Sequence, residues 1–183
     1  GDGDLCDGQL FGCGPDLLCG EGRCQSDAEL RRCPDDWPVV RLRQDQLGRS
    51  VFMGMADGPH RVTGSCGVDG ATMQVLEYVP IRDGRYFIGV DAIDENGELA
   101  PADVDPILLA RRHCTPLVAD EITELACVDR AANEPIDLSD YVAGRLSPIA
   151  ALDLNADEPV YLYVSGRQDW AGGYRLRIIP DNA

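Results

Sequence analysis

The sequence has 183 residues, of which 44% are hydrophobic, and its formal net charge is −16. The hydrophobic share is ordinary for a folded chain of this length and excludes global disorder. The acidity argues against nucleic-acid and anionic-membrane partners, which need basic surfaces. No apolar run approaches the ~20 residues of a membrane helix, so membrane insertion is not expected.

The chain contains eight cysteines, an even number, four of which lie close together near the N-terminus. Disulfides persist in oxidising compartments, so this density predicts a secreted protein or one on the outer cell surface. The sequence shows no signal peptide, which predicts that a leader has been removed. Eight cysteines allow 105 pairings, so their number alone does not give the connectivity.

Residues 1–33 are predicted to form a linker stub followed by a small disulfide-rich module. The first four residues alternate Gly and Asp, a linker composition. The following segment is too small to fold by burial alone. We expect interleaved bridges, Cys6–Cys19 and Cys13–Cys24. Zinc is the alternative, but these cysteines lack the Cys-x2-Cys spacing of structural zinc sites.

The module is expected to end at the breaker Pro34–Pro38, after one helical turn within Ser26–Arg32. Residues 34–183 are predicted to form the main domain. Cys33 lies at the boundary, and its most economical partner is Cys66. That bridge would fix the module against the main domain.

The main domain is predicted to consist of short β-strands separated by turns. The segments show alternating or continuously apolar patterns and no long amphipathic helix, which is typical of a β-sandwich. One short helix is predicted at Leu117–Leu125. The expected strands are Val39–Arg43, Val51–Met55, Arg61–Ser65, Met73–Val79, Gly84–Ala92, Ile107–Ala110, Ile149–Leu154, Val160–Val164 and a final strand from Tyr174.

The segment from Asp105 to Asp129 carries two cysteines separated by a short loop. An apolar run before Cys114 predicts a buried strand. Because Cys127 follows soon after in the sequence, we expect a Cys114–Cys127 bridge that closes this loop at one end of the sandwich.

Five motifs in order resemble the bacterial pre-peptidase C-terminal domain, in the cysteine-containing form of secreted myxobacterial proteins. They are Thr63-Gly-Ser-Cys-Gly-Val-Asp-Gly-Ala, Asp83-Gly-Arg-Tyr-Phe, Asp105-Pro-Ile-Leu-Leu-Ala-Arg-Arg-His-Cys, Glu124-Leu-Ala-Cys-Val-Asp and Gly172-Gly-Tyr-Arg-Leu-Arg-Ile. The resemblance covers about Val39 to Pro180. It implies a jelly-roll-like antiparallel β-sandwich that is appended to exported proteins and is not catalytic.

The resemblance also implies calcium binding, which some members of that family show. Asp105 and Asp129 match acidic positions of the family pattern, whereas Pro106, Val128 and Arg130 replace polar ones. Arg130 offers an alternative, a salt bridge in place of the ion. The acidic insert before Asp105 supplies further oxygens, which suit Ca²⁺. The candidate metal ligands are Asp94, Glu95, Asp103, Asp105 and Asp129.

We find no catalytic set in the sequence. His60 and His113 have no metal-type partner at helical spacing. Thr63-Gly-Ser-Cys-Gly is close to a nucleophile elbow, but Thr stands where Gly is required. Cys66 is expected in a disulfide rather than as a nucleophile. Aromatic residues suit a carbohydrate site, and the candidates are Trp37, Trp170, Tyr161, Tyr163 and Tyr174.

These observations predict a non-catalytic secreted or cell-surface binding or accessory module. Its expected partner is an extracellular protein, a polysaccharide or another copy of the chain. The alternative is a self-assembling fibre or surface-layer subunit that associates through edge strands. A hydrolase with an unrecognised site is the third interpretation.

Overall fold

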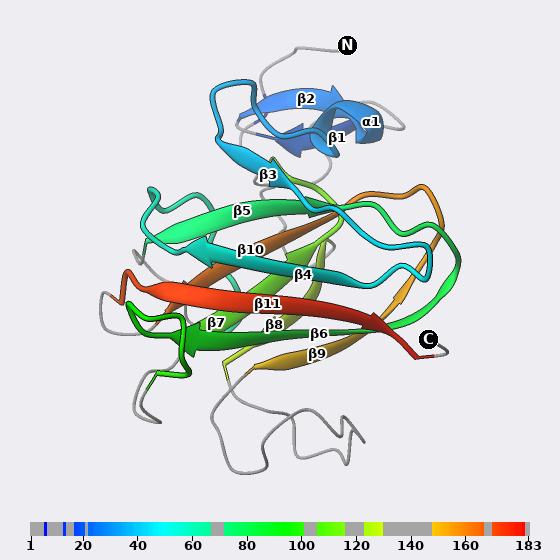
Figure 1. Cartoon of the computed structure of the whole chain (residues 1–183). Helices are drawn as coiled ribbons and strands as arrows, with labels where there is room; N and C mark the ends of the chain where they lie inside the picture. The colour runs from blue at the N-terminus through cyan, green and yellow to red at the C-terminus, as the bar shows by residue number, and fades with distance from the viewer. Residues whose placement is uncertain are drawn as a thin grey trace.

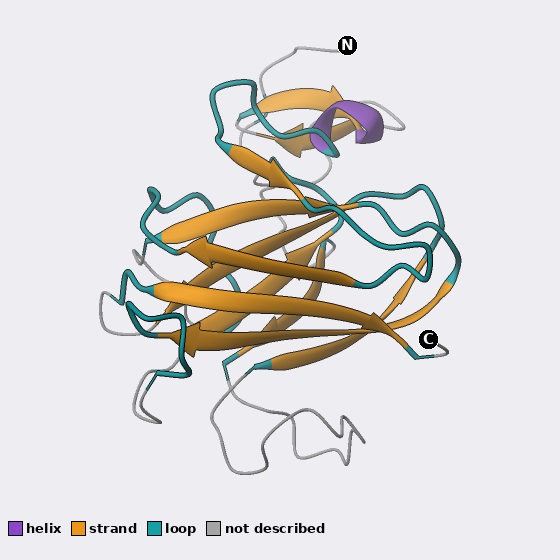
Figure 2. Cartoon of the chain, viewed as in Figure 1, coloured by secondary structure: helices purple, strands orange, loops and turns teal. Residues whose placement is uncertain are grey.

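The structure is a computed structural model that describes residues 6, 13, 17–20, 22–66, 72–100, 106–115, 123–129, 148–166 and 170–181. Nearly all regular structure in these residues is β (Figure 2). The elements are β1 Leu17–Gly20, β2 Arg23–Ser26, α1 Asp27–Leu30, β3 Val39–Arg41, β4 Ser50–Met55, β5 Met73–Tyr78, β6 Gly84–Ile93, β7 Pro106–Arg111, β8 Glu124–Val128, β9 Ile149–Leu154, β10 Val160–Gly166 and β11 Gly173–Pro180.

Two packed sheets form a β-sandwich, as the sequence predicted. The five-stranded sheet has the order β3-β5-β10-β7-β8, and the four-stranded sheet has the order β4-β11-β6-β9. A small hairpin, β1-β2, and α1 lie beside the β3–β5 edge of the sandwich (Figure 1). No helix among the described residues is both long enough and apolar enough to span a bilayer.

The core between the sheets follows directly from alternation along the strands. In β11, Tyr174, Leu176 and Ile178 are fully buried, whereas Arg175 and Arg177 are partly exposed on the outer face. Side chains of successive strand residues point to opposite faces, so one face of β11 fills the core. The same core contains residues of β5, β6, β7, β9 and β10.

A second hydrophobic cluster lies on the outer face of the five-stranded sheet. Tyr161, Tyr163 and Val75 belong to it, and Cys33 and Trp37 pack against it. Every residue of β10 is therefore buried, because both faces of the strand are covered. This explains why β10 reads as a continuous apolar run rather than an alternating one.

Two local predictions were wrong, and one strand pairing was not predicted. β3 pairs with β5 in parallel, although every other strand pair is antiparallel among the described residues. Arg61–Ser65 contains no strand. Where the sequence predicted the end of a helix, Glu124 and Leu125 begin β8, because Ala126 pairs with Ala110 of β7. The rest of that predicted helix, up to residue 122, lies outside the described residues.

Every cysteine of the chain is in a disulfide. The interleaved bridges Cys6–Cys19 and Cys13–Cys24 are as predicted. The other two predictions were wrong, because the bridges are Cys33–Cys114 and Cys66–Cys127.

The register of β7 and β8 explains the error. Cys127 lies opposite Leu109, whereas Cys114 lies five positions further along, beyond the end of β7. β7 ends at Arg111 and the chain then bends, so Cys114 lies outside the β7–β8 ladder that holds Cys127. Cys114 instead lies beside the segment that enters β3.

Candidate functional site

Residues up to Cys33, which we call the N-terminal segment, are attached to the sandwich just beyond the end of β7. The Cys33–Cys114 disulfide is the covalent part of this attachment. Beside it, the Thr115 N–H donates to the Leu30 carbonyl at 3.3 Å, and the Thr115 hydroxyl donates to the Arg32 carbonyl at 3.1 Å. Leu30 is fully buried. These contacts fix the position of residues 30–33 against the end of β7.

A hydrogen bond between two side chains extends the same attachment to helix α1. A capping box between Ser26 and Glu29 starts the helix and places Asp27 in its first turn. The Asp27 Oδ1 atom lies 2.6 Å from Nε2 of His113, which is buried. The hydrogen bond with His113 and, beside it, the Arg31 guanidinium hold the pKa of Asp27 below its ordinary value.

Replacing Asp27 by asparagine should therefore lower the melting temperature near neutral pH. Because the pKa of Asp27 is lowered in the folded state, its stabilising effect is present above the unfolded value, 3.8, and is lost as pH falls through the folded value. The melting temperatures of wild type and Asp27→Asn should converge in acid. Asp36→Asn is the control for an exposed carboxylate. A constant difference at all pH values would contradict this assignment.

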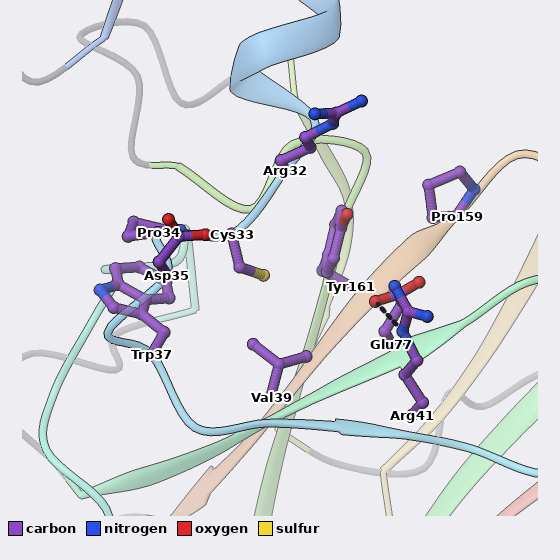
Figure 3. Close-up of a pocket in the computed structure, with 10 residues that line it drawn as sticks. All are labelled: Arg32, Cys33, Pro34, Asp35, Trp37, Val39, Arg41, Glu77, Pro159 and Tyr161. Carbon is purple, nitrogen blue, oxygen red and sulfur yellow. Dashed lines mark hydrogen bonds and ion pairs between the residues drawn. The ribbon is translucent and has the colours of Figure 1, made fainter.

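A groove of about 640 Å³ lies where the N-terminal segment meets the five-stranded sheet. We call it the junction groove (Figure 3). Its lining combines charged, aromatic and small apolar residues from segments distant in sequence. They are Arg32, Cys33, Pro34, Asp35, Trp37, Val39, Arg41, Glu77, Pro159 and Tyr161.

The strand register places three of these residues in one row across the sheet. Tyr161 of β10 lies opposite Glu77 of β5, and Glu77 lies opposite Arg41 of β3. The Arg41 Nε atom donates to Glu77 Oε2 at 3.2 Å. The Arg41 side chain is 83% exposed and that of Glu77 only 15%, so the arginine forms the rim and the carboxylate lies deeper.

The opposite end of the junction groove is formed by Trp37, with Pro34 and Asp35 beside it (Figure 3). The Arg61 guanidinium lies 4.9 Å from the centroid of the Trp37 ring. This cation–π contact supports the indole from outside the groove lining. Trp37 is thus held in place as a wall of the groove rather than left as a free surface side chain.

Tyr161 forms the floor between Arg32 and the Arg41–Glu77 pair (Figure 3). Burial, followed by the nearby Glu77 carboxylate, raises the pKa of Tyr161, so the phenol is neutral at physiological pH. Neutral phenol offers one O–H donor and an acceptor oxygen. Both are available at the boundary between a buried ring and the groove.

The structure does not gather the predicted calcium ligands into a site within the part of the chain that it describes. Asp94 accepts hydrogen bonds from the N–H groups of Asn96 and Glu98, both 2.9 Å, in the turn after β6. No group of three metal-ligating side chains there includes Asp94, Glu95 or Asp129. Asp103 and Asp105 lie outside the described residues.

The cysteine sulfurs near the N-terminus do not form a zinc site. Sulfur atoms of Cys6, Cys13 and Cys24 lie within 4.8 Å of one another. All three are bonded in disulfides, with Cys19 as the fourth cysteine, and so offer no thiolate ligands.

The residues that the sequence offered for catalysis or sugar binding mostly make contacts within the protein. The His60 Nε2 atom lies 3.3 Å from the Thr63 hydroxyl, and Cys66 is in a disulfide. Of the predicted aromatic set, Trp37 and Tyr161 line the junction groove. Tyr163 and Tyr174 are buried and hydrogen-bonded to other residues, and Trp170 packs against the core between the sheets.

Sequence reasoning missed the charged residues of the junction groove. Arg32 follows helix α1, Arg41 ends β3 and Glu77 lies in β5, and the three belong to no motif. The pairing of β3 with β5 brings Arg41 to Glu77, and the Cys33–Cys114 bridge brings Arg32 to the same place.

No family model matches the sequence, and no curated protein matches it. Among solved structures, the chain is similar to the pre-peptidase C-terminal domain of a collagenase from Bacillus anthracis. The identity is 14% and the TM-score 0.44, and the match covers 80% of this chain and 99% of that domain. The sandwich architecture is established by this chain's own strand pairing.

Proposed function

We propose that the chain is a non-catalytic extracellular binding or accessory module whose ligand contacts the junction groove. The observation that supports this most strongly is the way the groove is built. Arg32 and Cys33 come from the N-terminal segment, whereas Glu77 and Tyr161 come from the sandwich. The Cys33–Cys114 bridge holds the two sides together, and a preorganised site loses less conformational entropy when it binds.

The disulfides support an extracellular location. Four bridges in a chain of 183 residues are typical of oxidising compartments and would be reduced in most cytosols.

The residues that line the junction groove are suited to ligand recognition, because arginine, carboxylate and phenol groups form directional hydrogen bonds.

The test is a binding panel combined with a turnover panel. The intact chain is presented to gelatin, fibrillar collagen and a set of soluble polysaccharides, and bound protein is measured over a concentration series. We expect saturable binding to at least one of them and no turnover of esterase, glycosidase or peptidase substrates. Turnover abolished by a single substitution, or no binding to any member, would contradict the proposed function.

Self-assembly, the other prediction from the sequence, has less support. Val51, Met53 and Met55 are exposed on β4, which lies at the edge of its sheet. However, the Met55 N–H donates to Gln74 Oε1, so this part of the edge is already paired. A net charge of −16 also opposes association between copies.

Calcium binding stays a prediction from the acidic segment. An ion that binds only the native chain at a hundred times its Kd stabilises it by about 2.7 kcal/mol. Calcium held by the predicted carboxylates should therefore raise the melting temperature relative to a chelator. The Asp103→Asn/Asp105→Asn double variant should lose this shift, and Asp36→Asn should keep it. Equal melting temperatures of the wild type with calcium and with chelator would contradict calcium binding.

A further inference from the structure

The Tyr161 hydroxyl differs from the other described tyrosine hydroxyls. Those of Tyr78, Tyr86 and Tyr163 donate to the carbonyls of Gly48, Arg82 and Cys114 at 2.6, 2.8 and 2.9 Å, and that of Tyr174 donates to Gln74. Tyr161 is only 4% exposed, yet its hydroxyl has no hydrogen-bonding partner among the described residues.

The Tyr161 ring is buried, but its hydroxyl oxygen is not among the buried side-chain atoms that lack a partner in the described residues, so this oxygen is open to solvent. An accessible hydroxyl without a protein partner bonds to water, and a ligand hydroxyl can take the place of that water. Tyr161 belongs to the lining of the junction groove, so a ligand in the groove can reach this hydroxyl. The Tyr161 hydroxyl can therefore form a hydrogen bond with a ligand that carries donor or acceptor groups.

The other residues that line the junction groove indicate which class of ligand it can bind. The Arg41–Glu77 pair presents a planar donor and a planar acceptor side by side, and Arg32 adds further donors beside Tyr161. Adjacent hydroxyl groups of a sugar ring both donate and accept, so they match such a set. Trp37 and Val39 provide apolar surface for the C–H groups of the same ring.

We infer that the junction groove binds a neutral polysaccharide, with Tyr161 and Glu77 contacting sugar hydroxyls and Trp37 contacting the face of a ring. This rests on the proposed function and names its ligand class. A net charge of −16 disfavours polyanions, which the many carboxylates repel at long range. A neutral chain of sugar rings meets no such repulsion.

The experiment is affinity electrophoresis of the intact, oxidised chain in native gels. Separate gels contain hydroxyethyl cellulose, xylan, laminarin, soluble starch or glycol chitin as uncharged or weakly charged polysaccharides. Polygalacturonate represents polyanions, and gelatin represents polypeptides. We expect retardation by at least one neutral polysaccharide and none by polygalacturonate.

Two tyrosine variants provide a matched pair, because the residues are two positions apart on one face of β10. Tyr161→Phe removes a hydroxyl with no protein partner, so we expect an unchanged melting temperature and about three- to tenfold weaker binding. Tyr163→Phe removes the hydrogen bond to the Cys114 carbonyl. It should lower the melting temperature but leave the retardation as in wild type. Glu77→Gln should weaken binding by about tenfold or more.

Failure of this inference can be distinguished from failure of the proposed function. Retardation only by gelatin or only by polygalacturonate would overturn the neutral-polysaccharide assignment and leave a binding module. Retardation that is equal in wild type, Tyr161→Phe and Glu77→Gln would place the site elsewhere and also overturn the inference. Absence of retardation in every gel would overturn the inference and count against the proposed function as well.

Discussion

Replacing Cys33 and Cys114 together by alanine should lower the free energy of unfolding by about 3 to 4.5 kcal/mol. The bridge joins residues 81 positions apart, so it restricts the unfolded chain strongly. The lower end of the range applies because Cys66–Cys127 overlaps the same loop and already restricts part of it. Urea denaturation followed by tryptophan fluorescence measures the change. The variant should also lose binding at the junction groove.

The control for this prediction is the Cys13→Ala/Cys24→Ala variant, which removes a bridge confined to the N-terminal segment. Its residues are only 11 positions apart. We expect the unfolding transition of the sandwich to keep its midpoint in this variant. A Cys33→Ala/Cys114→Ala variant with wild-type stability would contradict the role assigned to the Cys33–Cys114 bridge.

The second large effect is expected at the centre of the sandwich. Leu176→Ala should lower the free energy of unfolding by about 2 to 5 kcal/mol, because Leu176 is fully buried between the sheets and its truncation leaves a cavity. Thermal and urea denaturation of the oxidised protein measure the change. The variant should remain folded at room temperature, since the four disulfides are unaffected.

Met53→Ala is the matched control on the neighbouring strand. Met53 lies opposite Arg175, the residue before Leu176, and is 57% exposed. Its replacement should change the free energy of unfolding by no more than about 0.5 kcal/mol. Met53 and Arg175 share the outer face of the four-stranded sheet. Equal losses of unfolding free energy for Leu176→Ala and Met53→Ala would mean that this outer face contributes as much as the core face.

Period-two alternation made the sandwich predictable from the sequence. Tyr174, Leu176 and Ile178 alternate with Arg175 and Arg177, and this pattern alone assigns the inner face of β11. β10 was recognised as a strand too, although its two covered faces hide the alternation. β8 was missed because its residues are only half-buried and follow a segment with helical character.

The wrong disulfide predictions have a physical cause. Proximity in sequence favoured Cys114–Cys127 and Cys33–Cys66, but pairing of β7 with β8 separates Cys114 from Cys127. A hydrogen bond between the Ser65 N–H and Glu124, 3.0 Å, instead brings the loop with Cys66 to β8 and hence to Cys127. Strand register is not contained in cysteine spacing.

The junction groove depends on the same long-range pairing. Trp37 and Tyr161 were named from sequence as aromatic candidates, but nothing in the sequence placed them together. The parallel pairing of β3 with β5 and the Cys33–Cys114 bridge decide that. Parallel pairing of two strands far apart in sequence has no local signature.

Disulfide mapping of the unreduced protein tests the central claim most directly, namely that Cys33–Cys114 holds the N-terminal segment on the five-stranded sheet. Cleavage after arginine and glutamate separates the relevant cysteines into peptides 33–41, 62–77, 113–121 and 125–130. Mass spectrometry should find 33–41 linked to 113–121, and 62–77 linked to 125–130. Linkage of 113–121 to 125–130, or free thiols at these positions, would contradict the account.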